Sequence, residues 1–169
     1  MKLMRVYFIV AVFVFSLTAA ARAADDANKN TSGLPLPRYA SLARDTANMR
    51  TGPGTRYPIE WVYTRQGLPV EITAEYDVWR RVRDPDGAEG WIHKTELSHK
   101  RTATVTGAAH DLLAAADDKA SIVAHLDAGS IGQIVSCAKD WCKLKFDSDI
   151  KGYLRKTFVW GAYPNEVFD

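Results

Sequence analysis

An internal repeat with an offset of 62 residues constrains this chain more than any other feature. From Gly67 onward, a shift of 62 positions brings residues of similar chemistry onto one another without a gap, whereas upstream of Gly67 the match needs about one further residue. The matched pairs are Gly67 and Gly129, Ile72 and Ile134, Trp79 and Trp141, Val82 and Leu144, Gly90 and Gly152, Trp91 and Tyr153, Lys94 and Lys156, and Leu97 and Val159. A constant offset over this many pairs indicates two copies of one unit of roughly 60 residues, close to the lower limit for an independent hydrophobic core.

The first copy has the periodicity of β-strands. Residues 69–75 alternate between apolar and polar side chains, as a half-buried strand should, and residues 59–64 and 78–83 are rich in aromatic and β-branched side chains. The turn Asp-Pro-Asp-Gly at 84–87 precedes a last strand at 89–93. Five short strands joined by tight hairpins predict a small, strongly bent barrel. In the second copy, only residues 111–116 have a helical composition.

Several local motifs resemble one known family. They are the Asn-x-Arg-x-Gly-Pro turn at 48–53, the mid-domain Trp79, and the Gly-Trp-Ile at 90–92 before a short helical turn. Together they resemble the bacterial SH3-like (SH3b) domain family, in particular its exported alphaproteobacterial branch of unknown function. The resemblance covers residues 33–106, and the second copy is divergent at its first turn. It implies an all-β chain with two tandem small SH3-like barrels of about five strands each, and a role as a binding module for cell-wall or peptide ligands.

The first 23 residues have the pattern of a secretory signal peptide. Lys2 and Arg5 precede an uncharged apolar run at 6–20, and Ala21-Arg22-Ala23 matches an A-x-A cleavage site. No cysteine precedes Cys137, so no lipid attachment site follows the leader. We therefore expect a periplasmic or secreted protein without a stable membrane anchor. The predicted segments are a signal peptide at 1–23, a flexible segment at 24–37, barrel 1 at 38–98, a divergent barrel 2 at 99–160, and a C-terminal tail at 161–169.

Removal of the leader changes the charge balance. The full chain has 22 basic and 20 acidic residues and a net charge of +2. Cleavage after Ala23 removes three basic and no acidic residues, which leaves 19 basic residues against 20 acidic ones, a net charge of −1. The basic pI therefore belongs in part to the leader, and we expect no nucleic-acid partner.

Cys137 and Cys142 bracket the predicted hairpin turn of the second copy. An exported protein with two cysteines usually joins them, so we predict a structural disulfide, with thiol-redox chemistry as the alternative. The repeat places Glu75 and Arg80 at the same two positions of the first copy, which predicts an ion pair in place of the disulfide. If Ile72 and Val82 share the core face, simple alternation offsets the positions of Glu75 and Arg80, and so of the two cysteines, by one residue. Both the offset and the directly opposed register are compatible with a disulfide, which needs a Cα separation of roughly 4.4–6.8 Å.

The residues that we predict to bind a ligand lie on the first copy and are mostly aromatic. A small barrel cannot bury all of these rings, and exposed Trp and Tyr side chains near Arg suit stacking on a sugar or a groove for an extended peptide. The alternation predicts that Trp79 points outward with Arg81 if Val82 is in the core. The candidate residues are Asn48, Arg50, Tyr57, Trp61, Tyr63, Tyr76 and Trp79.

No motif in the sequence indicates catalysis, a metal or a cofactor. The four histidines form no i, i+3 or i, i+4 pair, and no metalloprotease or serine-hydrolase motif is present. We therefore predict a non-enzymatic, cofactor-free envelope module that binds peptidoglycan or a wall peptide. The alternative is a periplasmic adaptor between proteins that binds no glycan, and a thiol-redox protein is a third hypothesis. The loop Gly52-Pro53-Gly54 has turn chemistry in which either glycine could take a positive φ.

Overall fold

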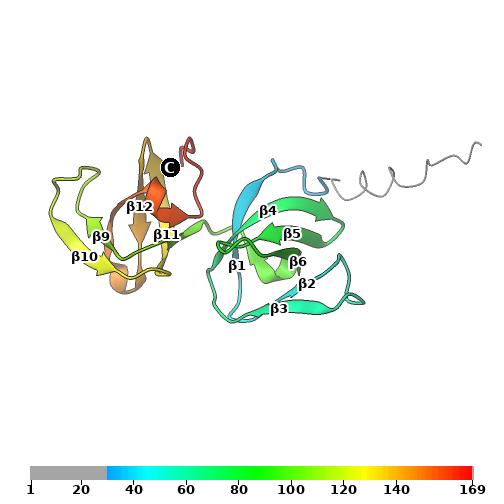
Figure 1. The fold of residues 1–169 in the computed structure, drawn as a ribbon. Helices are drawn as coiled ribbons and strands as arrows, with labels where there is room; N and C mark the ends of the chain where they lie inside the picture. The colour runs from blue at the N-terminus through cyan, green and yellow to red at the C-terminus, as the bar shows by residue number, and fades with distance from the viewer. Residues whose placement is uncertain (1–29, 169) are drawn as a thin grey trace, which may run out of the picture.

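The computed structural model describes residues 30–168, so the predicted signal peptide and the first part of the predicted flexible segment lie outside the described residues. Within them the chain is all-β and forms two seven-stranded antiparallel sheets, one for each repeat (Figure 1). Two tandem SH3-like barrels are therefore confirmed. Each sheet has seven strands rather than about five, because short strands at the ends of each repeat join the sheet.

The first barrel is built from residues 38–98. Its sheet has the order β3-β2-β6-β5-β4-β1-β7, so β3 and β7 are its edge strands. A single-turn 3₁₀ helix, η2 (Lys94–Glu96), lies between β6 and β7 where a helical turn was predicted. The strands are β1 (Arg38–Leu42), β2 (Ala47–Arg50), β3 (Ile59–Tyr63), β4 (Pro69–Tyr76), β5 (Trp79–Arg83), β6 (Glu89–His93) and β7 (Leu97–Ser98).

The second barrel repeats this plan strand for strand, in the order β10-β9-β13-β12-β11-β8-β14. Its strands are β8 (Thr102–Val105), β9 (His110–Leu113), β10 (Ile122–Leu126), β11 (Ile131–Ala138), β12 (Trp141–Lys145), β13 (Lys151–Arg155) and β14 (Val159–Trp160), with 3₁₀ helices η3 (Asp147–Asp149) and η4 (Lys156–Phe158). The helical composition of residues 111–116 was misleading, since residues 110–113 form β9. Leu112 is fully buried there, so tertiary packing overrides local propensity.

Each barrel has its own apolar core, as the repeat requires. The core of the first contains Ala40, Leu42, Ala47, Met49, Tyr63, Val70, Ile72, Val82 and Ile92. The core of the second contains Ala103, Val105, Leu112, Leu126, Ile134, Cys137, Cys142, Leu144, Leu154, Val159 and Ala162. Because the two clusters are separate, each copy buries its own apolar face and the repeat is a duplication of a complete domain.

Gly90 in β6 and Gly152 in β13, which are equivalent in the repeat, each allow the neighbouring strand of the barrel to approach closely. A Cβ atom on Gly90 would lie 2.5 Å from Met49 Cγ and 2.9 Å from the carbonyl oxygen of Arg50. A Cβ atom on Gly152 would lie 2.5 Å from Leu112 Cγ. Only glycine lets the neighbouring strand pass this close, which explains why the repeat retains glycine at both positions.

The two barrels contact each other through the region around Tyr39. The Tyr39 ring lies 5.5 Å from the Trp160 ring and 4.6 Å from the Tyr163 ring. The Tyr163 hydroxyl donates to Glu71 Oε1 over 2.8 Å, and Glu71 is buried and also pairs with Arg83. Burial, followed by the negative charge of Glu71, raises the pKa of Tyr39 to about 12. The sequence did not indicate this junction.

Candidate functional site

The Gly-Pro-Gly loop between β2 and β3 is shaped around Tyr57. A Cβ atom on Gly52 would lie 2.5 Å from Tyr57 Cδ1, and one on Gly54 would lie 3.4 Å from Tyr57 Cδ2. The ring of Tyr57 therefore rests on the backbone of Gly52, which only a residue without a side chain permits. Neither glycine has a positive φ, so close approach to the Tyr57 ring, and not an unusual turn conformation, explains Gly52, whereas a Cβ atom on Gly54 would make only an ordinary van der Waals contact.

Arg50 and Asn48 hold this loop and its strand in place. Arg50 Nη1 donates to the carbonyl oxygens of Tyr57, over 2.8 Å, and Thr55, over 3.2 Å. The backbone N–H of Asn48 donates to Glu96 Oε2 over 2.9 Å. Both side-chain hydrogen bonds of Arg50 are therefore with the loop itself, which assigns it a positioning role next to the candidate surface.

The exposed aromatic and apolar side chains gather on the β2–β3 hairpin. Trp61 is 57% exposed, and its neighbours Ile59 and Val62 are 46% and 47% exposed. Arg56 lies over the Tyr57 ring at 5.0 Å from its centroid and donates to the Tyr57 hydroxyl over 3.2 Å. We call this region the β3 hairpin surface, defined as Arg56, Tyr57, Ile59 and Trp61. Val62 follows Trp61 directly on β3 and therefore faces the other side of the sheet.

Tyr76 belongs to the same end of the barrel. Its side chain is 43% exposed at the end of β4. The pKa of Arg56 is raised chiefly by its hydrogen bond to Tyr57, and the nearby Tyr76 contributes to the same shift. Tyr57, Trp61 and Tyr76 are therefore the predicted aromatic residues that remain at least partly open to solvent on the first barrel.

Two of the predicted site residues are buried. Tyr63 is 5% exposed, and its hydroxyl donates to the buried Asp84 Oδ2 over 2.9 Å. Trp79 is 8% exposed and lies edge-on to the ring of His93, its partner across the β5–β6 pair, at 5.3 Å. The expectation that Trp79 is exposed was wrong because the His93 ring packs against it.

The second barrel lacks an equivalent aromatic surface. Its β9–β10 hairpin spans the residues that correspond to the Gly-Pro-Gly loop, without glycine, proline or an aromatic side chain in the loop. Its exposed apolar residues there are Ile122 and Val123. Because both copies form the same sheet, the fold does not require the Gly-Pro-Gly loop, and the aromatic side chains are an addition to the first copy.

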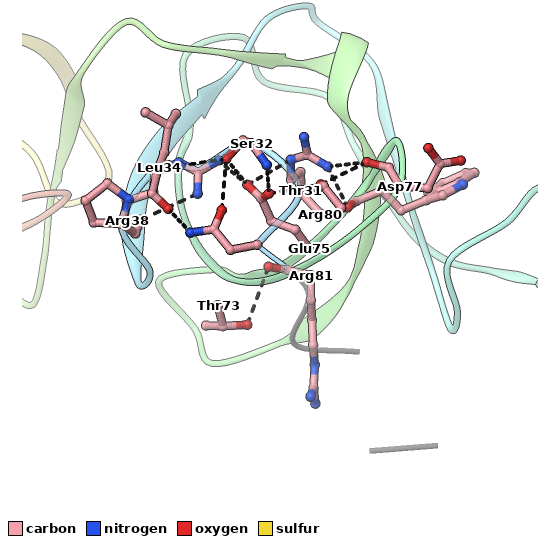
Figure 2. Close-up of polar contacts among 12 residues, drawn as sticks. Thr31, Ser32, Leu34, Arg38, Thr73, Glu75, Asp77, Arg80 and Arg81 are labelled. Carbon is pink, nitrogen blue, oxygen red and sulfur yellow. Dashed lines mark hydrogen bonds and ion pairs between the residues drawn. The ribbon is translucent and has the colours of Figure 1, made fainter. Parts of the chain in front are cut away.

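A polar site, separate from the β3 hairpin surface, surrounds Glu75 on β4 (Figure 2). Its carboxylate is fully buried and accepts hydrogen bonds from the backbone N–H of Ser32 at 2.7 Å, the hydroxyl of Ser32 at 2.7 Å and the hydroxyl of Thr31 at 3.1 Å. It also pairs with Arg38, at 2.5 Å, and with Arg80, at 3.2 Å. Burial by itself would raise the pKa of Glu75, but the hydrogen bonds from Ser32, Arg38 and Thr31 outweigh burial and lower the pKa to about 2. Thr31 and Ser32 belong to the segment that we predicted to be flexible.

Position 137, which matches Glu75 in the repeat, contacts the other end of the chain. Cys137 is joined to Cys142 by the predicted disulfide, and its N–H and C=O both pair with Phe168 in the C-terminal tail. The two cysteines are directly opposite each other, because the register shifts between Ile134 and Ser136. Simple alternation therefore gave the wrong register. The same shift, between Ile72 and Ala74, aligns Glu75 with Arg80 in the first barrel.

Residues 30–168 contain neither a candidate metal site nor a candidate membrane-spanning helix. No group of three or more His, Cys, Asp or Glu side chains within them is arranged to hold a metal ion. No helix in the same part of the chain is long and apolar enough to cross a membrane.

Comparison with known proteins gives one family and several distant structures. A family model described as bacterial SH3 domain matches the chain twice, over residues 43–99 and 109–161. No curated protein sequence matches the chain. Similar solved structures include NlpC2 from Trichomonas vaginalis, with 13% identity, a TM-score of 0.34 and coverage of 75% of this chain and 49% of that chain. NlpC1 from the same organism has 15% identity, a TM-score of 0.34 and coverage of 76% and 47%.

A third similar structure is an NlpC/P60 family protein from Bacillus cereus, with 14% identity, a TM-score of 0.33 and coverage of 72% of this chain and 55% of that chain. The chain thus spans about half the length of the solved structures that it matches.

Proposed function

Because this chain belongs to the bacterial SH3 domain family and carries two copies of the domain, we propose that it is an exported, non-enzymatic binding module of the cell envelope. Its ligand is peptidoglycan or a wall peptide, and its binding site is the β3 hairpin surface with Tyr76. Export rests on the leader pattern at 1–23. The assignment as a binding module rests on the family and on the absence of a catalytic motif from the sequence.

The exposure of Trp61 is the observation that supports this proposal most. An indole that is 57% exposed on an edge strand, in the same hairpin as a tyrosine ring with an arginine over it, gives a ligand a flat apolar face and a polar margin. Aromatic faces of this kind stack on sugar rings and on extended peptides. The second barrel, which has the same strands, offers no aromatic ring in the corresponding loop.

An adaptor between periplasmic proteins is the second candidate, and one observation favours it. Both β3 and β10 are edge strands with exposed apolar side chains, including Ile59 on β3 and Ile122 on β10. An edge strand can pair with a strand of another protein without any glycan. A redox role is disfavoured, because Cys137 and Cys142 are 1% and 0% exposed and so are out of reach of a thiol partner.

Sedimentation with isolated peptidoglycan separates these functions. The purified protein is expected to pellet with peptidoglycan, and Trp61→Ala is expected to leave most of it in the supernatant. Ile122→Ala, which removes an exposed apolar side chain from β10, the strand equivalent to β3, is the control and should pellet like the wild type. Wild-type protein that stays in the supernatant would exclude the glycan proposal and leave the adaptor.

A further inference from the structure

A cavity of about 600 Å³ lies where the two barrels and both ends of the described chain meet. Its charged lining consists of Arg38, Arg80, Lys94 and Arg101, and no Asp or Glu lines it. Its apolar walls include Leu34, Tyr39, Leu97 and Phe168. The cavity therefore combines positive charge with apolar surface, and it is separate from the β3 hairpin surface.

The charges in this cavity are only partly neutralised. Glu75 pairs with both Arg38 and Arg80, and Glu166 pairs with Arg101 at 2.5 Å. Lys94 is exposed and takes part in none of the ion pairs within residues 30–168. Four basic side chains thus line the cavity, and only two carboxylates, Glu75 and Glu166, pair with them. This leaves an excess of positive charge at the cavity wall.

The repeat brings one arginine from each copy to this cavity. Arg38 pairs with Ile72 in the register of the first barrel, and the carbonyl oxygen of Arg101 accepts from the N–H of Ile134, the repeat partner of Ile72. Arg38 and Arg101 therefore occupy equivalent positions. The junction between the barrels places both on one cavity, so the second barrel adds Arg101 to the basic side chains of the first.

Arg101 and Arg80 are held in fixed positions before any ligand binds. Arg101 lies 5.6 Å from the ring centroids of both Tyr39 and Phe168, and it donates to the carbonyl oxygen of Gly161 over 2.7 Å. Arg80 donates to the carbonyl oxygens of Asp77 and Trp79, each over 2.9 Å. Cations that are already ordered lose little conformational entropy when an anion binds.

From this arrangement we infer that the junction cavity binds the free carboxylate of a small organic anion, such as the C-terminus of a short peptide with small apolar side chains. The carboxylate lies near Lys94, and the aliphatic part of the ligand contacts the apolar walls. A small excess of positive charge beside apolar walls fits a carboxylate with aliphatic neighbours better than it fits a phosphate. The inference concerns a site separate from the β3 hairpin surface and does not rest on the proposed function.

The test uses N-acetyl-alanyl-alanine with a free carboxylate as the probe, its C-terminal amide as the uncharged counterpart, and inorganic phosphate as the second anion. Two-dimensional NMR of the purified protein is expected to show shifts at Lys94, Leu97 and Arg101 with the free carboxylate and none with the amide. Lys94→Gln should weaken binding about fivefold. Lys119→Gln, which removes an exposed lysine outside the cavity, should leave it unchanged.

Four results would overturn the inference. They are the absence of shifts at the cavity, equal shifts with the amide, tighter binding of phosphate than of the peptide, and equal effects of the two lysine variants. Trp61→Ala keeps this test apart from the proposed function. It should weaken binding to peptidoglycan through the hairpin surface about tenfold while leaving the affinity for the acetylated peptide unchanged.

Discussion

Glu75 and Arg80 lie directly opposite each other across the β4–β5 hairpin, with Arg80 Nε 3.2 Å from Glu75 Oε1. Cys137 and Cys142 are joined at the same two positions of the second barrel. The same fold therefore accepts a covalent or an ionic link at one site. The ionic link needs additional donors, since a buried carboxylate is stable only when its hydrogen bonds are satisfied, and residues 31, 32 and 38 supply them.

Glu75→Gln is expected to lower the free energy of unfolding at pH 7 by about 3 kcal/mol, because the shift of the Glu75 pKa from 4.5 to about 2 represents stabilisation of the charged form. A lowered pKa means that this stabilisation is complete above pH 4.5 and is lost as the pH falls from 4.5 toward 2. Urea denaturation of both proteins across this range measures it. Wild type and variant should converge at pH 2, and a constant difference between them would contradict the assignment.

Removal of the disulfide is expected to cost about 2 kcal/mol, because Cys137 and Cys142 are only five residues apart and a short loop restricts the unfolded chain modestly. The measurement is thermal unfolding of the wild type with and without reductant. The double variant Cys137→Ala/Cys142→Ala serves as the control and should not respond to reductant. A wild-type melting temperature that is the same after complete reduction in denaturant and refolding as in the oxidised protein would show that the link does not stabilise the fold.

Gly52→Ala is expected to displace the ring of Tyr57, because the new Cβ would lie 2.5 Å from Tyr57 Cδ1. The cost to the free energy of unfolding should be about 1 kcal/mol, as for other overpacked sites. Binding to peptidoglycan should fall with it. Gly54→Ala is the matched control, since its Cβ would lie 3.4 Å from the other side of the ring. Equal stability and equal binding to peptidoglycan in the two variants would mean that the position of the Tyr57 ring affects neither quantity.

Tyr163→Phe is expected to weaken the junction between the barrels by about 2 kcal/mol, because it removes the hydrogen bond to the buried carboxylate of Glu71. The free energy of unfolding should decrease, and NMR relaxation should show more independent tumbling of the two barrels. Tyr153→Phe, which changes a partly buried tyrosine on β13, should alter neither quantity. Unchanged stability and tumbling in Tyr163→Phe would argue against the junction.

Much of the fold followed from periodicity and from the repeat. The alternation in residues 69–75 predicted β4, and the offset of 62 predicted the equivalent strand β11 in the second copy. The ion pair at Glu75 and Arg80 was predicted from the cysteines in the other copy. Alternation failed where each long strand has a register shift, because a bulge moves the following residues to the other face and leaves no clear mark in the sequence.

The candidate site could be predicted only in part. The exposure of Trp61 and Tyr76 agrees with the expectation that one small barrel cannot bury every ring. The burial of Trp79 depends on its partner His93, which comes from another strand. The contact between Glu71 and Tyr163 joins residues 92 positions apart, and a pattern within one copy carries no information about contacts between copies.

The most direct test of the central claim is the dissociation constant for solubilised peptidoglycan fragments, measured by calorimetry with the wild type, Trp61→Ala and Ile122→Ala. The account predicts that the wild type binds, that Trp61→Ala raises the dissociation constant about tenfold through the loss of the stacking face, and that Ile122→Ala leaves it unchanged. Absence of binding by the wild type, or equal dissociation constants for the wild type and Trp61→Ala, would contradict a binding site on the first barrel.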